Sequence, residues 1–357
     1  MIRATCAFRA PRVNGLSATT SVSRVVELDA LRGLAALAVV AFHYTTFYGR
    51  EVGHVGPAPL SFAFGNYGVQ LFFLISGFVI FMTLERTRTP ADFVVSRFSR
   101  LFPAYWAAIL LSAAVVYTIG LPSQRLPWKE VALDFTMIQD LLGGRHLDGS
   151  YWTLEVELFF YAQMLFWYAI GQLKRIHWII AAWLLLAVVC GLATKFNRHF
   201  SYLLRELLIL RHIPFFALGI LFYRLRTHPQ GRRLDTSLIG LCIVAIGIAY
   251  PPVFALVALA CSAIFALFVT NRMTWLRGAP FVFLGAVSYS LYLLHQAIGF
   301  SLIWHFEHDA GLGAGAAAIC AALLVTVLAT ALTWFIERPA MRLIRDAWKR
   351  HSRPAPA

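Results

Sequence analysis

The sequence predicts an all-α protein, a polytopic membrane helix bundle with about ten transmembrane helices and both termini in the cytoplasm. Of the 357 residues, 59% are hydrophobic and only 13% are charged, whereas about 25% are charged in a soluble protein. This composition excludes a secreted module, a cytosolic enzyme and a disordered tail protein. The net charge of +14 does not indicate nucleic-acid binding, because the basic residues occupy short loops between apolar runs, as cytoplasmic loops do.

Ten apolar runs are candidates for membrane-crossing helices, each of which needs about 20 mostly apolar residues. They are residues 28–48, 66–84, 101–120, 151–171, 177–194, 203–223, 236–250, 252–270, 281–304 and 312–336. The seventh and eighth runs meet in a tight hairpin at Tyr250-Pro251-Pro252. The longest connection, 121–150, has a weakly apolar middle that could lie on the membrane or dip into it.

The distribution of basic residues orients the predicted spans. If the N-terminus is cytoplasmic, 22 of the 31 lysine and arginine residues fall in inner segments and six in outer loops. This bias, with an even number of spans, places both termini in the cytoplasm. We therefore predict a flexible cytoplasmic N-terminal tail over 1–24, a transmembrane domain over 25–343 and a basic cytoplasmic C-terminal tail over 344–357. The five cysteines form neither a disulfide framework nor a metal-binding pattern, and no metal is expected.

Charged side chains within spans are functional candidates, because each costs about 2.5–3.5 kcal/mol to insert. Arg32 and His43 in the first span are eleven residues apart, which puts them on one helix face about 16 Å apart along the axis. That face carries a fixed cation near the cytoplasmic end and a titratable imidazole near mid-membrane. A histidine hydrogen-bonded by a neighbouring helix is the structural alternative.

Two arginines precede the third span. Arg97 and Arg100 share a helix face at the inner interface, and their guanidinium groups suit phosphate oxygens. The structural alternative is that they reach lipid headgroups at the inner boundary.

Carboxylates form the third group of candidates. Glu155 and Glu157 begin the fourth span about 200° apart around the helix, so only one readily faces a shared cavity. Glu337 closes the tenth span, near the negative end of the helix dipole. Internal ion pairs are the structural alternative, with Arg205, Glu206 and Arg211 near the sixth span and with Arg338 or Arg342 beside Glu337.

Six motifs follow one another along these spans. They are Arg32 with His43, Gly68-Val69-Gln70-Leu71-Phe72-Phe73 with Ser76-Gly77-Phe78, Arg97-x-x-Arg100-Leu101-x-Pro103, Trp152-Thr153-Leu154-x-Val156-Glu157, Ser288-Tyr289-x-x-Tyr292-Leu293-x-His295, and Glu337-x-Pro339. In this order the set resembles the acyltransferase-3 family, integral-membrane acyltransferases that modify bacterial surface and secreted glycans. Thr153 stands where the family motif has serine.

The resemblance implies transfer of an acyl group, commonly acetyl, from acetyl-CoA or another acyl-CoA to a hydroxyl of an extracytoplasmic glycan or lipid-linked sugar. It implies that Arg97 and Arg100 hold coenzyme A, that His43 is the essential histidine with Arg32 on the same face, and that Glu337 is the motif carboxylate. It favours Glu157 over Glu155. The expected location is the bacterial cytoplasmic (inner) membrane, as a multi-pass protein.

The mechanism and two other classes stay open on the sequence. His43 could act as a general base or accept the acyl group itself. Arg32 is too far along the axis to bond His43 and is assigned to the donor path or to an ion pair with Glu337. A transporter with buried proton-linked His and Glu residues and a non-catalytic membrane partner are the alternatives. An acetyl-CoA turnover assay separates all three.

Overall fold

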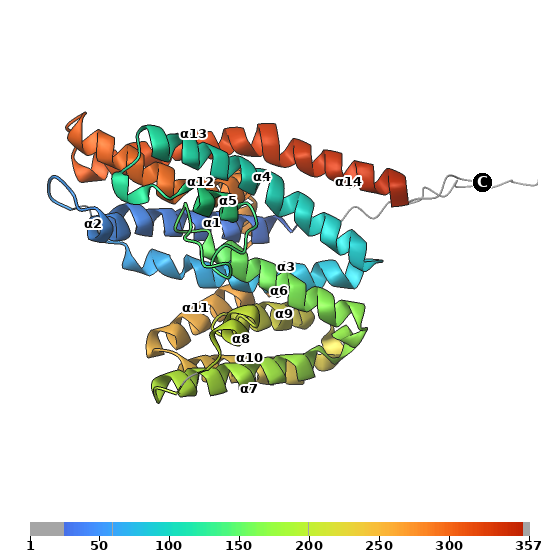
Figure 1. The fold of residues 1–357 in the computed structure, drawn as a ribbon. Coiled ribbons are helices and arrows are strands. Elements are labelled where there is room, and N and C mark those ends of the chain that lie inside the picture. The colour runs from blue at the N-terminus through green and yellow to red at the C-terminus, as the bar shows by residue number, and fades with distance from the viewer. Residues whose placement is uncertain (1–24, 59, 199, 353–357) are drawn as a thin grey trace, which may run out of the picture.

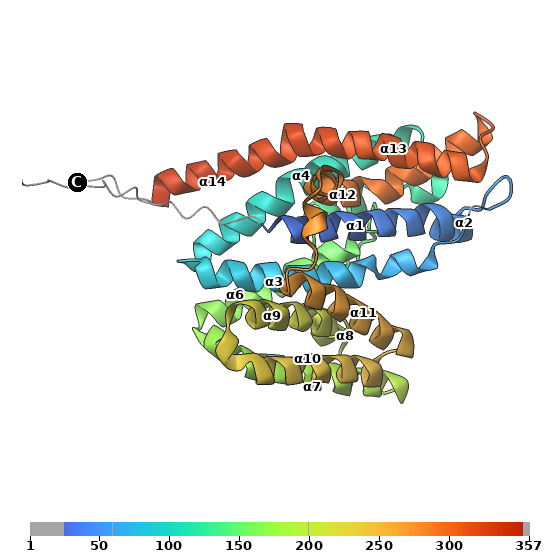
Figure 2. The ribbon, with the colours of Figure 1, turned by 180° about the vertical axis from the view of Figure 1, so that it is seen from behind.

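The computed structural model describes residues 25–58, 60–198 and 200–352, so the predicted tail over 1–24 lies outside the described residues. Every regular element within them is helical, which confirms the all-α class (Figures 1 and 2). Six helical segments of this part of the chain are long and apolar enough to cross a membrane. Four further predicted spans also form helices, but these are shorter or carry more polar residues.

The helix bounds follow the predicted spans closely in most places. The long helices are α1 (Val26–Phe42), α3 (Gly68–Arg86), α4 (Pro90–Thr118), α6 (Trp152–Ala169), α7 (Ile176–Lys195), α9 (Ile213–Thr227), α10 (Arg232–Ala249), α11 (Pro252–Val269), α12 (Ala279–His308) and α13 (Ala314–Leu332). Shorter helices are α2 (Tyr48–Glu51), α5 (Trp128–Asp134) and α8 (Tyr202–Leu207), and α14 (Arg338–Ser352) prolongs α13.

Three predicted boundaries are wrong. The third span begins at Pro90, where Thr89 caps the helix with a capping box, so Arg97 and Arg100 lie within α4. The predicted span 203–223 is broken between α8 and α9, where Ile209 has a φ of 47°. The last span does not end at Glu337: a π-helical turn over Thr333–Glu337 leads directly into α14.

The helices form two groups on either side of α3. Helices α1, α4, α12 and α13 pack on one side, and α7, α9, α10 and α11 on the other. The α3–α4 and α6–α7 connections lie at the same end of the bundle as α14 (Figure 1). An ion pair between Arg277 and Glu27 (2.6 Å) joins the loop before α12 to the start of α1. We call this the inner end, because its connections carry most of the basic residues.

Glycine permits a close contact between α3 and α9. A Cβ added at Gly77 of α3 would lie 2.0 Å from the carbonyl oxygen of Phe216, and one at Gly219 of α9 would lie 2.0 Å from that of Leu74. The two backbones therefore touch at reciprocal glycines, as small residues allow in membrane bundles.

We expect Gly77→Ala to destabilise the bundle, because the added methyl group must push two backbones apart, and overpacking typically costs about 1–3 kcal/mol. Thermal unfolding in detergent measures the loss. Gly240→Ala is the control, since a Cβ there meets no atom within 4 Å. An unchanged unfolding temperature for Gly77→Ala would contradict the α3–α9 contact.

Candidate active site

A cavity of about 90 Å³ lies between α1, α3, α4, α6 and α12 and is lined by Arg32, Arg97, Arg100 and Glu157. We call it the inner cavity. Four of the six predicted site residues thus meet at one place, although they come from three helices. The alternative in which Arg97 and Arg100 only reach lipid headgroups does not describe their position, because both face this cavity.

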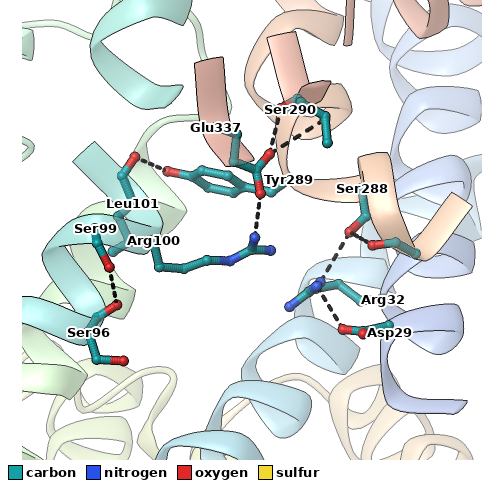
Figure 3. Close-up of polar contacts among 12 residues, drawn as sticks. Asp29, Arg32, Ser96, Ser99, Arg100, Leu101, Ser288, Tyr289, Ser290 and Glu337 are labelled. Atoms are coloured by element: carbon teal, nitrogen blue, oxygen red, sulfur yellow. Dashed lines mark hydrogen bonds and ion pairs between the residues drawn. The ribbon is translucent and has the colours of Figure 1, made fainter. Parts of the chain in front are cut away.

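Arg32 is held by its own helix and by α12. Its Nη2 contacts Asp29 Oδ1 at 2.9 Å, and its Nε donates to Ser288 Oγ at 3.1 Å. In Figure 3 the guanidinium groups of Arg32 and Arg100 point toward one another. The predicted ion pair between Arg32 and Glu337 is wrong: each has a different partner, because α12 separates the start of α1 from the π-helical turn that carries Glu337.

The partner of Glu337 is Arg100. Nη1 of Arg100 forms an ion pair with Glu337 Oε1, and Ser290 donates to Oε2 at 2.8 Å (Figure 3). Glu337 is 2% exposed, so this is a buried ion pair. The alternative pairing of Glu337 with Arg338 or Arg342 is wrong.

Arg97 forms no ion pair with a described residue. Its Nη2 donates to Ser96 Oγ at 3.0 Å, while its buried Nε has no hydrogen-bond partner in this part of the chain. On α14, Arg345 donates to the carbonyl oxygen of the same Ser96 at 3.3 Å and to Ser99 Oγ at 3.0 Å. Three guanidinium groups therefore gather at the inner end, and the Glu337 carboxylate pairs with only one of them.

Glu157 and Glu155 have different partners, as their angular separation predicts. Glu157 Oε1 accepts from Ser76 at 2.6 Å and from Tyr161 at 2.5 Å and faces the inner cavity. Glu155 instead accepts the backbone N–H groups of Asp140 and Leu141, both at 3.2 Å. Glu155 is therefore not paired with an arginine, since backbone amides take that role, whereas Arg205 and Glu206 form the internal ion pair expected near the sixth span (2.8 Å).

His43 does not line the inner cavity and pairs with His295 of α12. Its Nδ1 lies 2.9 Å from the carbonyl oxygen of Val39 and 3.2 Å from Nε2 of His295, whose own Nδ1 lies 2.7 Å from the carbonyl oxygen of Tyr292. A carbonyl oxygen only accepts, so both Nδ1 atoms carry protons. Nε2 of His295 then shares the Nδ1 proton of His43 with the Val39 carbonyl oxygen, and Nε2 of His43 has no hydrogen-bond partner among the described residues.

Tyr292 connects this histidine pair to the inner cavity. Its ring lines the cavity, and its centroid lies 5.4 Å from that of His295. The Tyr292 hydroxyl lies 2.9 Å from the hydroxyl of Thr153, which gives the threonine in the serine position a defined contact. The Tyr292 ring therefore lies between the inner cavity and His295, which in turn contacts His43.

His43 and Glu337, two of the predicted site residues, both lie in π-helical turns. His43 begins the π-helical segment His43–Phe47, and Glu337 ends Thr333–Glu337. Such turns occur frequently at functional sites. The second also accommodates Pro339, which would clash with a carbonyl in a regular helix.

The long connection between α4 and α6 supports the turn of α12 that carries His295. Asp148 Oδ2 accepts from the backbone N–H of Ala297 at 2.7 Å, and the Tyr151 hydroxyl donates to the carbonyl oxygen of Leu293 at 3.3 Å. Burial raises the pKa of Asp148. The connection therefore holds α12 on both sides of His295.

These features define a multi-pass membrane protein with an arginine-lined inner cavity and a buried histidine pair beside it, an arrangement that suits a membrane-embedded transferase. A family model described as an acyltransferase domain matches residues 25–338. The chain belongs to the acyltransferase-3 family, and the predicted membrane acyltransferase is confirmed.

Three individual relatives are similar to this chain, and one of them is named an acyltransferase. Acyltransferase MdmB of Streptomyces mycarofaciens is 27% identical, with 90% of this chain and 93% of the relative covered. Exopolysaccharide production protein ExoZ of Rhizobium meliloti is 26% identical over 79% of this chain and 91% of its own. Protein 2 in the picA locus of Rhizobium radiobacter is 40% identical over 28% of this chain and 51% of its own. No solved structure matches this chain.

Proposed function

We propose that the protein transfers an acyl group, commonly acetyl, from acyl-CoA to a hydroxyl of an extracytoplasmic glycan or lipid-linked sugar. The observation that carries the proposal is the position of Tyr292, between the arginine-lined inner cavity and the His43–His295 pair. The name of ExoZ, an exopolysaccharide production protein, supports a glycan acceptor. A cytosolic donor and an exported acceptor fit the bacterial cytoplasmic membrane.

The donor site follows from the excess of positive charge at the inner end. Arg100 is paired with Glu337, whereas Arg97 and Arg345 have no carboxylate partner among the described residues. Partly buried guanidinium groups without counter-ions favour an anion, and phosphate oxygens match their geometry. We propose that Arg97 and Arg345 bind the nucleotide phosphates of coenzyme A. We assign a structural role to Arg100, whose ion pair with Glu337 stabilises the entrance of the cavity.

His43 supplies the proton transfer in this proposal. Its free Nε2 lone pair takes the proton of a sugar hydroxyl as that oxygen attacks the thioester carbonyl carbon. The C–S bond then breaks, and the thiolate leaves with the proton from His43. The products are an O-acyl ester and the free thiol of coenzyme A. Acylated protein formed with donor alone would indicate that Nε2 attacks first and that transfer proceeds in two steps.

Two experiments test the function. Mass spectrometry of surface glycans from cells with and without the protein identifies the acyl group and the acceptor. An acetyl-CoA turnover assay in membranes tests the donor. Turnover with an acylated glycan product is the expected result; a substrate carried across the membrane without consumption of acyl-CoA would contradict the proposal.

Arg97→Ala should raise the KM for acyl-CoA about tenfold or more, because a charge-assisted contact contributes about 1.5–3 kcal/mol, while kcat changes little. Steady-state kinetics in membranes measure both. Arg88→Ala is the control, since Arg88 is exposed in the α3–α4 connection. A change in acceptor preference without a change in donor KM would show that the donor site is assigned wrongly.

A further inference from the structure

A second, larger cavity of about 720 Å³ opens at the other end of the bundle. We call it the outer cavity. It lies among the outer ends of the helices: Lys195 ends α7, Tyr250 and Pro251 join α10 to α11, and Trp152 begins α6. It is large enough for a sugar unit, since ligand pockets usually measure about 300–1,000 Å³.

Aromatic rings and polar groups are interleaved on its wall. Trp152, 36% exposed, packs beside His212 with 5.3 Å between ring centroids, and Phe254 and Tyr250 also line the cavity, with 6.3 Å between their own centroids. Flat amphipathic rings with a few fixed polar groups suit a ligand that has both apolar and hydroxyl-bearing faces.

Gln70 of α3 provides an independent indication of a ligand. The residue lines the outer cavity and is only 7% exposed, yet its Oε1 has no hydrogen-bond partner among the described residues. A buried acceptor without a partner typically costs about 1–3 kcal/mol. A hydroxyl donor from a bound molecule would satisfy it.

The charges of the lining favour a neutral ligand. Three basic side chains are balanced by three acidic ones, which are Lys195, Arg205 and Arg211 with Asp140, Glu155 and Glu206. Arg205 and Glu206 pair with each other at 2.8 Å, and Glu155 is occupied by backbone amides. At the inner end, by contrast, Arg97 and Arg345 have no carboxylate partner among the residues that the structure describes. An uncharged polyol therefore fits the outer cavity better than a phosphate does.

The two cavities are neighbours that share one lining residue. Val69 lines both of them. On α6, Trp152 and Val156 line the outer cavity, whereas Thr153 and Glu157 line the inner cavity. The first turns of α3 and α6 form the wall between them. Thr153 in that wall contacts Tyr292, which lies against His295.

From these observations we propose that the outer cavity binds the acceptor as a neutral sugar unit, with Trp152 packing on the ring and Gln70 Oε1 accepting a sugar hydroxyl. The assignment to an acceptor rests on the acyl-transfer function proposed above. The proposal that this cavity binds a neutral sugar does not depend on that function.

The test uses the full-length protein in detergent and a set of neutral methyl glycosides of glucose, galactose and rhamnose as probes. Saturation-transfer NMR should detect binding of at least one glycoside to the wild type, and Gln70→Met and Trp152→Leu should each weaken it at least tenfold. Gln230→Met and Trp178→Leu are matched controls, because both side chains are exposed and outside the cavity. Absence of binding to the wild type, or equal binding by the cavity variants, would overturn the proposal.

Glycan acylation in cells separates this inference from the proposed function. We expect Gln70→Met to lower acylation at least tenfold and to leave the donor KM unchanged. Normal acylation by both cavity variants would show that the acceptor does not bind in the outer cavity, and it would not contradict the proposed acyl transfer. Glycoside binding without any acyl transfer by the wild type would leave the sugar site in place and contradict the function.

Discussion

His43→Ala should abolish acyl transfer while leaving membrane insertion and folding intact. The variant loses the free Nε2 lone pair that takes the hydroxyl proton, and a positioned acid–base group typically contributes about 10²- to 10⁴-fold. The donor KM should change little, because His43 lies beyond Tyr292 and outside the inner cavity. Acetyl-CoA turnover and glycan acylation in membranes measure the loss.

The control is His308→Ala, since His308 is exposed at the outer end of α12. His295→Phe removes the ring nitrogen that lies 3.2 Å from Nδ1 of His43 and helps to orient its ring, and should lower kcat by a smaller factor, with the donor KM unchanged. Turnover equal to the wild type by His43→Ala would remove the histidine from the mechanism.

The second large effect concerns the buried Arg100–Glu337 ion pair. Glu337→Ala leaves the Arg100 cation in a largely buried place without its partner, and breaking a buried pair in this way costs about 3–5 kcal/mol. We expect a clear fall in the unfolding temperature in detergent. Replacing both groups by amides, in Arg100→Gln with Glu337→Gln, should recover most of the stability, because no uncompensated charge remains.

Glu206→Ala is the matched control. Its partner Arg205 is 39% exposed and Glu206 itself 33%, and exposed pairs contribute only about 0–1 kcal/mol. If Glu337→Ala were no more harmful than Glu206→Ala, the carboxylate would not stabilise the cavity mouth.

Apolar runs predict the spans well because a helix in lipid must satisfy its own backbone and expose apolar side chains. The same signal misplaces helix ends. Polar residues at the inner end of α4 and along α14 remain helical outside the apolar region, which the runs cannot indicate. The break before α9 depends on backbone conformation near Ile209, not on hydropathy.

The site was predictable as a set of residues but not as a set of pairs. Helical spacing puts Arg97 and Arg100 on one face and separates Glu155 from Glu157. The contacts of His43 with His295 and of Arg100 with Glu337 join residues 252 and 237 positions apart, and local periodicity says nothing about them. His295 was visible as a histidine inside a span and as the end of one of the six motifs, but not as the partner of His43. Arg345 was visible only as one of several basic residues near the C-terminus.

In the proposed mechanism the thiol end of coenzyme A passes Tyr292 and reaches His43. Disulfide trapping tests it directly: a His43→Cys variant, with the five native cysteines replaced by serine, is incubated with coenzyme A and copper–phenanthroline as the oxidant, and intact-protein mass spectrometry detects the adduct. We predict a mixed disulfide that is suppressed by adding Arg97→Ala, whereas the adduct that an exposed His308→Cys control forms with coenzyme A from solution should not depend on Arg97. Failure of His43→Cys to form the adduct, while an Arg32→Cys variant in the inner cavity forms it, would contradict the claim.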